Sequence, residues 1–272
     1  MTSRPVRIAV QLQPQHASYE QMRDAVGRAE ELGVDVIFNW DHFFPLNGDP
    51  DGKHFECWTT LAAWAEQTSR VQLGALVTCN SYRNPELLAD MARTVDHVSG
   101  GRVILGIGSG WFEKDYDSYG FEFGTAGGRL NELARAIPRI ESRLRMLNPA
   151  PAGPMPVLIG GGGEKKTLRL VAEHANIWHS FADVETLAHK LQVLRGHCTA
   201  VGRDFDEIEV SVGVGGRGRD GGIAGDPEVE GQPLLDLGAR LFTLGASGPD
   251  YDLSVLRTWL AWRDRLNENA AG

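Results

Sequence analysis

The sequence has few cysteines and no long apolar run. Its three cysteines, Cys57, Cys79 and Cys198, lie far apart, and no two of them form a C-x-x-C pair. An odd and scattered set of cysteines does not indicate a disulfide framework, so we expect free thiols in a cytoplasmic protein. No stretch of about 18 apolar residues occurs, and the first residues lack an apolar core, so we expect no membrane span and no signal peptide.

Positive charge is also scarce. The chain has 27 Lys and Arg against 36 Asp and Glu, which gives a formal net charge of −9. Nucleic acids and anionic membranes favour basic surfaces, so we expect neither as the main partner. The Pro-rich connector at 149–156 is too short to tether two domains, and we therefore predict a single domain over residues 1–272.

Short β-branched apolar runs alternate with longer helical patterns along almost the whole chain. Strands are predicted at 6–12, 34–39, 71–77, 102–107, 157–159, 176–179, 208–214 and 240–244. Helices are predicted at 18–32, 56–67, 84–98, 127–147 (with a kink or break at Pro138), 164–174, 184–201, 233–237 and 253–266. Eight alternations in 272 residues predict an α/β fold, a closed (β/α)8 TIM barrel, because this fold typically takes about 250 residues. A doubly wound open sheet is the alternative, and the Gly-rich segment 215–231 is predicted to be a mobile loop.

A run of four glycines, Gly160 to Gly163, follows a predicted strand and precedes a predicted helix that begins near Glu164. Glycine allows positive φ and a close approach of the backbone to a ligand, and the free N–H groups of a helix N-terminus favour an anion. The segment therefore predicts a phosphate-binding turn at Gly161, Gly162, Gly163 and Glu164. A tight turn without a ligand is the alternative, because the spacing matches neither the dinucleotide fingerprint nor a Walker loop.

Asp41 and His42 are adjacent at the end of the second predicted strand, where the chemistry of such barrels lies. An Asp–His pair can act as acid and base or hydrogen-bond a heterocycle, and it can also ligate a metal. Only His54 and His179 are available as further ligands, and a catalytic zinc typically takes three protein ligands. We therefore expect no metal site, and a purely structural Asp–His pair is the remaining alternative.

Small residues alternate with larger ones at the end of the fourth predicted strand. Gly106, Gly108 and Gly110 lie just before Trp111. Residues without side chains leave room there for a flat ring, and Trp111 is placed to line that space. The alternative is that these glycines only relieve crowding at the rim of the barrel.

At these places together the chain resembles the luciferase-like monooxygenase superfamily, and most closely its members that use the deazaflavin coenzyme F420. The resemblance rests on four segments in the family's order, at 40–43, 82–89, 99–111 and 159–168. It implies an oxidoreductase that transfers a hydride between coenzyme F420 and a small organic substrate, and commonly a homodimer. An FMN-dependent monooxygenase is the close alternative. A non-catalytic flavin- or deazaflavin-binding protein and a metal-dependent barrel hydrolase or lyase are rivals from other classes.

The resemblance also implies roles for individual residues. His42 would lie beside the position of hydride transfer as the catalytic residue, and Asp41 would hydrogen-bond the deazaflavin ring. Further cofactor contacts are implied for Thr78, Ser109, Gly110 and Trp111, and for the phosphate-binding turn Gly161, Gly162, Gly163 and Glu164. A non-prolyl cis peptide is implied near 75–77.

Two features depart from the family's sugar-phosphate dehydrogenase branch. Trp111 stands where that branch has a catalytic glutamate, and its basic residues for a sugar phosphate have no clear match. The acid–base mechanism of that branch therefore cannot be transferred. Little insertion is expected in the loops after the fourth and seventh strands, which predicts an open substrate pocket.

Overall fold

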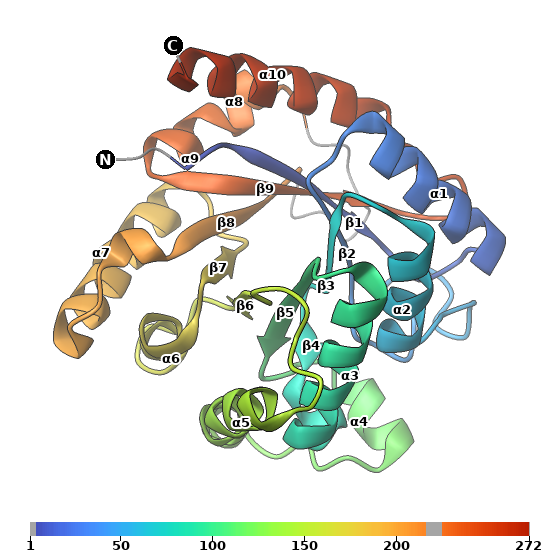
Figure 1. The fold of residues 1–272 in the computed structure, drawn as a ribbon, viewed down its shortest axis with the longest axis vertical. Coiled ribbons are helices and arrows are strands. Elements are labelled where there is room, and N and C mark those ends of the chain that lie inside the picture. Colours follow the sequence, from blue (N-terminus) through green and yellow to red (C-terminus); the bar gives the residue numbers. More distant parts are fainter. Residues whose placement is uncertain (1–3, 216–224, 272) are drawn as a thin grey trace.

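The computed structural model describes residues 4–215 and 225–271, and its centre is a closed sheet of parallel strands (Figure 1). In these ranges the strands are β1 (Arg7–Leu12), β2 (Val36–Asn39), β3 (Gln72–Ala75), β4 (Thr78–Cys79), β5 (Val103–Gly108), β6 (Val157–Gly160), β7 (Ile177–Ser180), β8 (Glu209–Val214) and β9 (Ala239–Ala246). β3 and β4 both pair with β5 and share one position, while β1 pairs with β9, so eight positions close into a barrel. The predicted (β/α)8 barrel is confirmed, and the open doubly wound sheet is excluded.

Helices surround the barrel on its outside (Figure 1). They are α1 (Tyr19–Leu32), α2 (Cys57–Gln67), α3 (Pro85–Ser99), α4 (Glu113–Tyr119), α5 (Ala126–Met146), α6 (Thr167–His174), α7 (Val184–Val201), α8 (Pro227–Glu230), α9 (Gln232–Asp236) and α10 (Ser254–Ala271), with 3-10 turns η1 (Asn80–Tyr82) and η2 (Phe205–Glu207). Within the described ranges, none of the helices is both long and apolar enough to cross a membrane.

Local sequence signals determine where several helices begin and end. The Ser18 hydroxyl accepts a hydrogen bond from the Gln21 N–H at 3.2 Å, and the Gln21 side chain accepts one from the Ser18 N–H at 2.8 Å, which forms a capping box before α1. Gly33 ends the same helix with φ of 98°, a conformation that glycine adopts without a steric penalty. Asn84 caps α3, and Pro85 occupies its first turn.

The inside of the barrel is filled in layers, because successive side chains of a strand point to opposite faces. The inward apolar layer consists of Ala9, Val36, Phe38, Leu76, Ile104, Leu158, Ile177 and Leu241. At the N-terminal ends of the strands, the Arg7 guanidinium contacts Glu209 at 2.6 Å and Gln72 at 2.5 Å, which closes that end with paired polar groups. Toward the C-terminal ends the inward residues become small or polar, so the filled core gives way to a cavity.

The third strand position is broken between β3 and β4. It was predicted as one strand at 71–77, but the peptide bond between Leu76 and Val77 is cis and separates two short strands. The non-prolyl cis peptide that the resemblance implied here is confirmed. Gly106 of β5 lies so close to the end of β3 that a Cβ on it would be 1.9 Å from the Ala75 carbonyl oxygen.

Two predicted helices differ in their course. α5 runs unbroken through Pro138, because its apolar face is buried through Leu133 and Ile137 and this packing outweighs the loss of one backbone hydrogen bond. α6 begins at Thr167 and not near Glu164. The side chain of Glu164 is instead drawn into an ion pair with Lys190 of α7.

Two predicted loops hold helices. The expectation of little insertion after the fourth strand is wrong, since the segment between β5 and α5 contains α4. α8 lies within the predicted loop 215–231, of which residues 216–224 lie outside the described residues. Both helices have fewer than eight residues, which is too short for a hydrophobic period to be recognised in the sequence.

We predict that Gly106→Ala lowers the free energy of unfolding by about 1–3 kcal/mol or more. The added Cβ would meet backbone of β3, which cannot move without shifting the sheet. Urea unfolding followed by circular dichroism measures the effect. Gly196→Ala in α7 is the control, because nothing lies within 4 Å of its added Cβ and alanine favours a helix by about 0.5–1 kcal/mol. Equal effects of the two substitutions would contradict this packing argument.

Candidate functional site

A cavity of about 540 Å³ opens at the C-terminal ends of the strands. Small-molecule sites typically occupy about 300–1,000 Å³, and the active sites of barrel enzymes lie at this end. The described residues that line the cavity are Gln11, Trp40, Asp41, His42, Leu46, Leu76, Val77, Cys79, Tyr82, Gly108, Ser109, Gly110, Trp111, Gly160, Gly161, His179 and Phe181.

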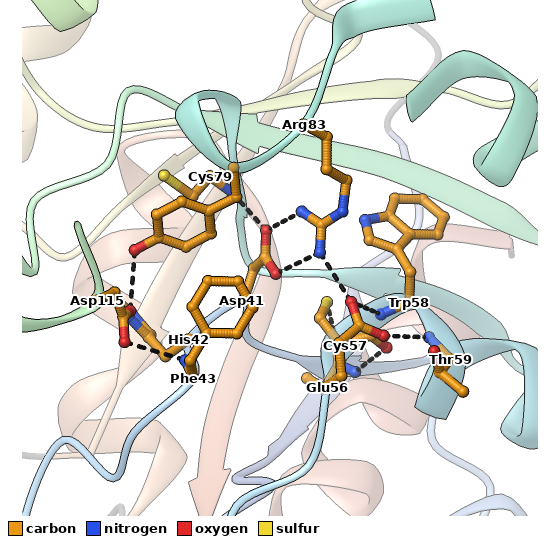
Figure 2. A network of polar contacts seen from close by, with 12 residues as sticks. Asp41, His42, Phe43, Glu56, Cys57, Trp58, Thr59, Cys79, Arg83 and Asp115 are labelled. Carbon is orange, nitrogen blue, oxygen red and sulfur yellow. Dashed lines mark hydrogen bonds and ion pairs between the residues drawn. The ribbon is translucent and has the colours of Figure 1, made fainter. Parts of the chain in front are cut away.

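Asp41 follows β2, and protein donors hold its buried carboxylate on both oxygens (Figure 2). The Arg83 guanidinium contacts it twice, from Nη1 to Oδ2 at 2.5 Å and from Nη2 to Oδ1 at 2.8 Å. The N–H of Cys79 donates to Oδ2 at 2.9 Å. A carboxylate has about four lone-pair sites, so these three bonds occupy most of them, and the Asp41 side chain is 0% exposed. Asp41 therefore fixes the end of β2 against β4 and the start of α3.

Glu56 extends this network to α2. Arg83 Nη2 also donates to Glu56 Oε1 at 2.8 Å, and the Glu56 carboxylate caps α2 by accepting from the N–H groups of Trp58 and Thr59. Burial raises the pKa of Glu56, but these N–H groups and the charge of Arg83 outweigh it and lower the pKa overall. Burial also works against the Arg83 charge, yet its hydrogen bonds to Asp41 raise the pKa of Arg83 above its usual value. The network is therefore a buried cation between two carboxylates.

Asp115 of α4 is fully buried and lies on the other side of Asp41 from Arg83, where it accepts three hydrogen bonds (Figure 2). His42 Nδ1 lies 2.7 Å from its Oδ2, the Tyr82 hydroxyl donates to the same oxygen at 2.9 Å, and the Phe43 N–H donates to Oδ1 at 3.1 Å. An ionised carboxylate only accepts, so Nδ1 of His42 carries the proton. The other ring nitrogen, Nε2, is then the one available for chemistry.

The His42 ring is confined to one orientation. It lines the cavity, and no described residue hydrogen-bonds its Nε2. The rings of Trp40, Trp111 and Phe112 meet it edge-on, with centroids 6.1, 5.6 and 5.4 Å away. Because Asp115 and these three rings surround it, the imidazole has little freedom to turn.

A cluster of aromatic residues supports this wall from behind. Phe43 packs on Tyr82 with ring centroids 4.9 Å apart, and the Tyr116 hydroxyl lies 3.2 Å from Cys79 Sγ. Burial raises the pKa of the Cys79 thiol and of the Tyr116 hydroxyl above their usual values. Both groups are therefore protonated at neutral pH, and Cys79 has no thiolate with which to act as a nucleophile.

Backbone forms another part of the wall. A Cβ on Gly108 would lie 2.7 Å from a Val77 methyl carbon, and one on Gly160 would lie 3.0 Å from the other. A Cβ on Gly110 would lie 2.0 Å from the Tyr116 hydroxyl oxygen. Only glycine fits at these three positions without rearrangement, so this wall is shallow and lacks projecting side chains.

The glycine turn after β6 lies at the rim of the cavity. Gly161 has φ of 122°, its N–H donates to the His179 carbonyl at 3.1 Å, and its carbonyl accepts from Trp178 Nε1 at 2.8 Å. These bonds hold the turn to β7. Glu164 faces away toward α7, where it accepts from Lys190 at 2.5 Å.

The structure brings part of the predicted site together. Asp41, His42, Ser109, Gly110, Trp111 and Gly161 line the cavity. Thr78, Gly162, Gly163 and Glu164 are outside its lining. In the described part of the chain, no group of three or more His, Cys, Asp or Glu side chains is placed to hold a metal ion.

Sequence reasoning missed three residues that organise the site, namely Arg83, Tyr82 and Asp115. Tyr82 and Arg83 begin the segment 82–89, so their position in a family motif was the available signal. Asp115 lies in a polar stretch after Trp111, 73 residues from the histidine that it contacts. No local pattern identifies such a pair.

Comparisons with known proteins show the family and the fold. The family model described as luciferase-like monooxygenase matches residues 2–215. An uncharacterized protein of Mycobacterium tuberculosis is 27% identical over 180 residues, which cover 59% of this chain and 64% of that protein. The F420-dependent glucose-6-phosphate dehydrogenase of Amycolatopsis mediterranei is 34% identical over 171 residues, which cover 54% of this chain and 50% of that enzyme.

A solved structure extends the likeness over nearly the whole fold. An F420-dependent secondary alcohol dehydrogenase in complex with an F420–acetone adduct superposes with a TM-score of 0.80 at 16% identity, covering 94% of this chain and 97% of that one. At this identity the likeness shows a shared fold. The chain spans between half and two thirds of the length of the two relatives above, at 50% and 64%.

We predict that Arg83→Met lowers the free energy of unfolding by about 3–5 kcal/mol, because it leaves the Asp41 carboxylate buried and unpaired. The Arg83 and Asp41 side chains are 9% and 0% exposed. Arg169→Met is the control, since its ion pair with Glu173 is 64% and 28% exposed and should contribute less than about 1 kcal/mol. Chemical denaturation measures both, and a loss at Arg83 as small as that at Arg169 would be inconsistent with a buried ion pair.

Proposed function

Because this chain belongs to the luciferase-like monooxygenase family, we propose that it is an oxidoreductase that transfers a hydride between coenzyme F420 and a small organic substrate. The observation that carries the proposal is His42, whose Nδ1 is bound to a buried carboxylate and whose ring lines a cavity beside a wall of glycine backbone. The F420-dependent name of the dehydrogenase relative supports a deazaflavin cofactor. FMN is the alternative cofactor.

The cavity suits a flat ring cofactor with a phosphate. Gly108, Gly110 and Gly160 line the cavity with backbone, and a wall of backbone can lie flat against a ring. Ser109 and Trp111 line the same side. We propose that these residues hold the deazaflavin ring.

The phosphate is assigned to the turn after β6. Gly161 lines the cavity, and Gly162 and Gly163 continue the turn toward the N-terminus of α6. Because α6 begins only at Thr167 and Gly161 donates its N–H to His179, the N–H groups of Gly162 and Gly163 are the donors proposed for the anion. A Cβ on Gly161 or Gly162 would have no contact closer than 3.4 Å, so the turn is open rather than filled by protein.

When bound, the deazaflavin would accept the hydride in the oxidising direction and donate it in the reducing direction, and the protein must move the proton and position the reactants. In the oxidising direction, Nε2 of His42 accepts the proton of a substrate hydroxyl, and the imidazolium that forms is stabilised by the Asp115 carboxylate. In the reducing direction, Nε2 returns this proton to a carbonyl oxygen. Asp41 keeps His42 in place through the neighbouring backbone, because Arg83 and the Cys79 N–H hold its carboxylate.

The lining argues against a sugar phosphate as the substrate. Among the described residues that line the cavity there is no lysine and no arginine, while Trp40, Leu46, Trp111 and Phe181 are apolar. A dianionic phosphate is normally bound by cationic side chains. We propose an uncharged organic substrate with a hydroxyl, a carbonyl or a polarised double bond.

We predict that the purified protein binds coenzyme F420 more tightly than FMN, with 1:1 stoichiometry. Titration followed by the fluorescence of each cofactor measures both affinities. Tighter binding of FMN would favour the monooxygenase alternative. Binding of neither cofactor would remove the proposed function.

We also predict that His42→Ala and Asp115→Asn lower turnover more than cofactor affinity. Loss of a general acid–base group costs about 10²–10⁴-fold in rate. Asp115→Asn should have a smaller effect, because Nε2 remains but the imidazolium loses its counter-charge. His97→Ala is the control, since His97 is exposed and lies in the last turn of α3. Turnover and F420 affinity are measured for each variant, and wild-type turnover in His42→Ala would exclude it from proton transfer.

A further inference from the structure

A second histidine, His179, lies across the barrel from His42, because β7 is four strand positions away from β2 in the closed sheet. His179 is on β7, two positions after Ile177 of the inward apolar layer, so its side chain also points into the barrel. It lines the cavity and is 1% exposed. Its Nδ1 lies 2.8 Å from the Ser211 hydroxyl, while its Nε2 is buried and has no hydrogen-bond partner in the described part of the protein.

Buried polar nitrogens are nearly always hydrogen-bonded in native proteins, so we expect a hydrogen-bond partner for Nε2 of His179. Gly213 faces it from β8, and a Cβ there would lie 3.7 Å from Nε2 and 2.5 Å from the Phe181 ring. The Phe181 ring stands edge-on to the imidazole, with centroids 4.6 Å apart. The absence of a side chain at Gly213 therefore makes room for the Phe181 ring beside the imidazole.

The environment of His179 differs in kind from that of His42. Burial lowers the pKa of His179 to about 3, so the ring is neutral at any ordinary pH. Its partner is a hydroxyl, which can donate or accept, whereas the partner of His42 is a carboxylate. The Ser211 hydroxyl thus allows Nε2 to be either an acceptor or a donor, and within residues 4–215 and 225–271 no counter-charge beside the ring would stabilise an imidazolium. His179 is suited to holding a polar atom and not to moving a proton.

We propose that His179 is a ligand-binding residue of this cavity, and that its Nε2 forms a hydrogen bond with an uncharged oxygen, a carbonyl or a hydroxyl, of the bound organic molecule. The inference rests on the proposed function, because it requires a ring cofactor or its substrate in the cavity. The oxygen belongs either to the ring or to the substrate. A neutral imidazole offers a hydrogen bond without a charge, which matches such an oxygen better than a phosphate or a carboxylate.

Nitrogen-15 NMR of histidine-labelled wild-type protein tests the contact directly. Spectra are recorded with no ligand, with F420, and with F420 and cyclohexenone as a model carbonyl compound, and His179→Gln assigns the resonance. A shift of Nε2 on addition of F420 places the oxygen on the ring. A shift only after cyclohexenone is added places it on the substrate, and no shift in either step overturns the inference.

Affinity measurements test the same contact by substitution. His179→Leu should weaken binding of the ligand identified by NMR about 10- to 100-fold, since one buried hydrogen bond is lost, and His179→Gln should restore most of it. Thr243→Val is the matched control. Thr243 also has a buried hydroxyl without a partner among the described residues, but it does not line the cavity, so its replacement should leave affinity unchanged. Equal losses at both positions would overturn a specific role for His179.

The two proposals fail in distinguishable ways. If wild-type protein binds F420 but the Nε2 resonance and the affinity of His179→Leu are unchanged, the role of His179 is wrong and the proposed function stands. If wild-type protein binds neither F420 nor FMN, the proposed function fails, and the inference about His179 fails with it.

Discussion

The Asp115 carboxylate is the contact on which the arrangement of the cavity depends. It is fully buried and joins three segments, namely its own helix α4, the residues after β2 through the His42 ring and the Phe43 N–H, and the residues before α3 through the Tyr82 hydroxyl. A buried carboxylate without such donors would be costly, so the three segments are held together around it. The same contact sets the tautomer of His42. Asp115 therefore contributes both to the stability and to the chemistry of the barrel mouth.

The interior of the barrel determines what can bind there. At the level of the apolar layer the strands fill the barrel with side chains, as parallel barrels normally do. Nearer the C-terminal ends of the strands, Gly108 and Gly160 contribute no side chain to the interior of the barrel, and Val77 occupies part of the space between them. The cavity thus has a wall of backbone and methyl groups on one side and polar side chains, His42 and His179, on others. This asymmetry is suited to a flat ring with a polar substrate beside it.

The fold was predictable from the sequence because its signals are local. Strand and helix periods, the Ser18 capping box and the Gly33 helix end each involve residues within a few positions of one another. The site was predictable only in part. The Asp41–His42 pair and the glycine segments stand out as motifs, whereas Asp115 and Arg83 acquire their roles through contacts 73 and 42 residues away. The short helix α4 was missed for the same reason, since packing against Phe43 and Tyr82 stabilises it more than its own sequence does.

The resemblance to the family accounts for only part of the structure. The barrel and the cis peptide match what the resemblance implied, whereas the roles of Asp41, His42 and His179 are proposals that rest on the residues around the cavity. The most direct test of the account is a crystal structure of the protein with coenzyme F420 bound. We predict the deazaflavin ring against Gly108 and Gly160, its reacting face toward His42, and the phosphate at Gly161 to Gly163. A ring bound outside this cavity, or a phosphate held away from that turn, would contradict the account.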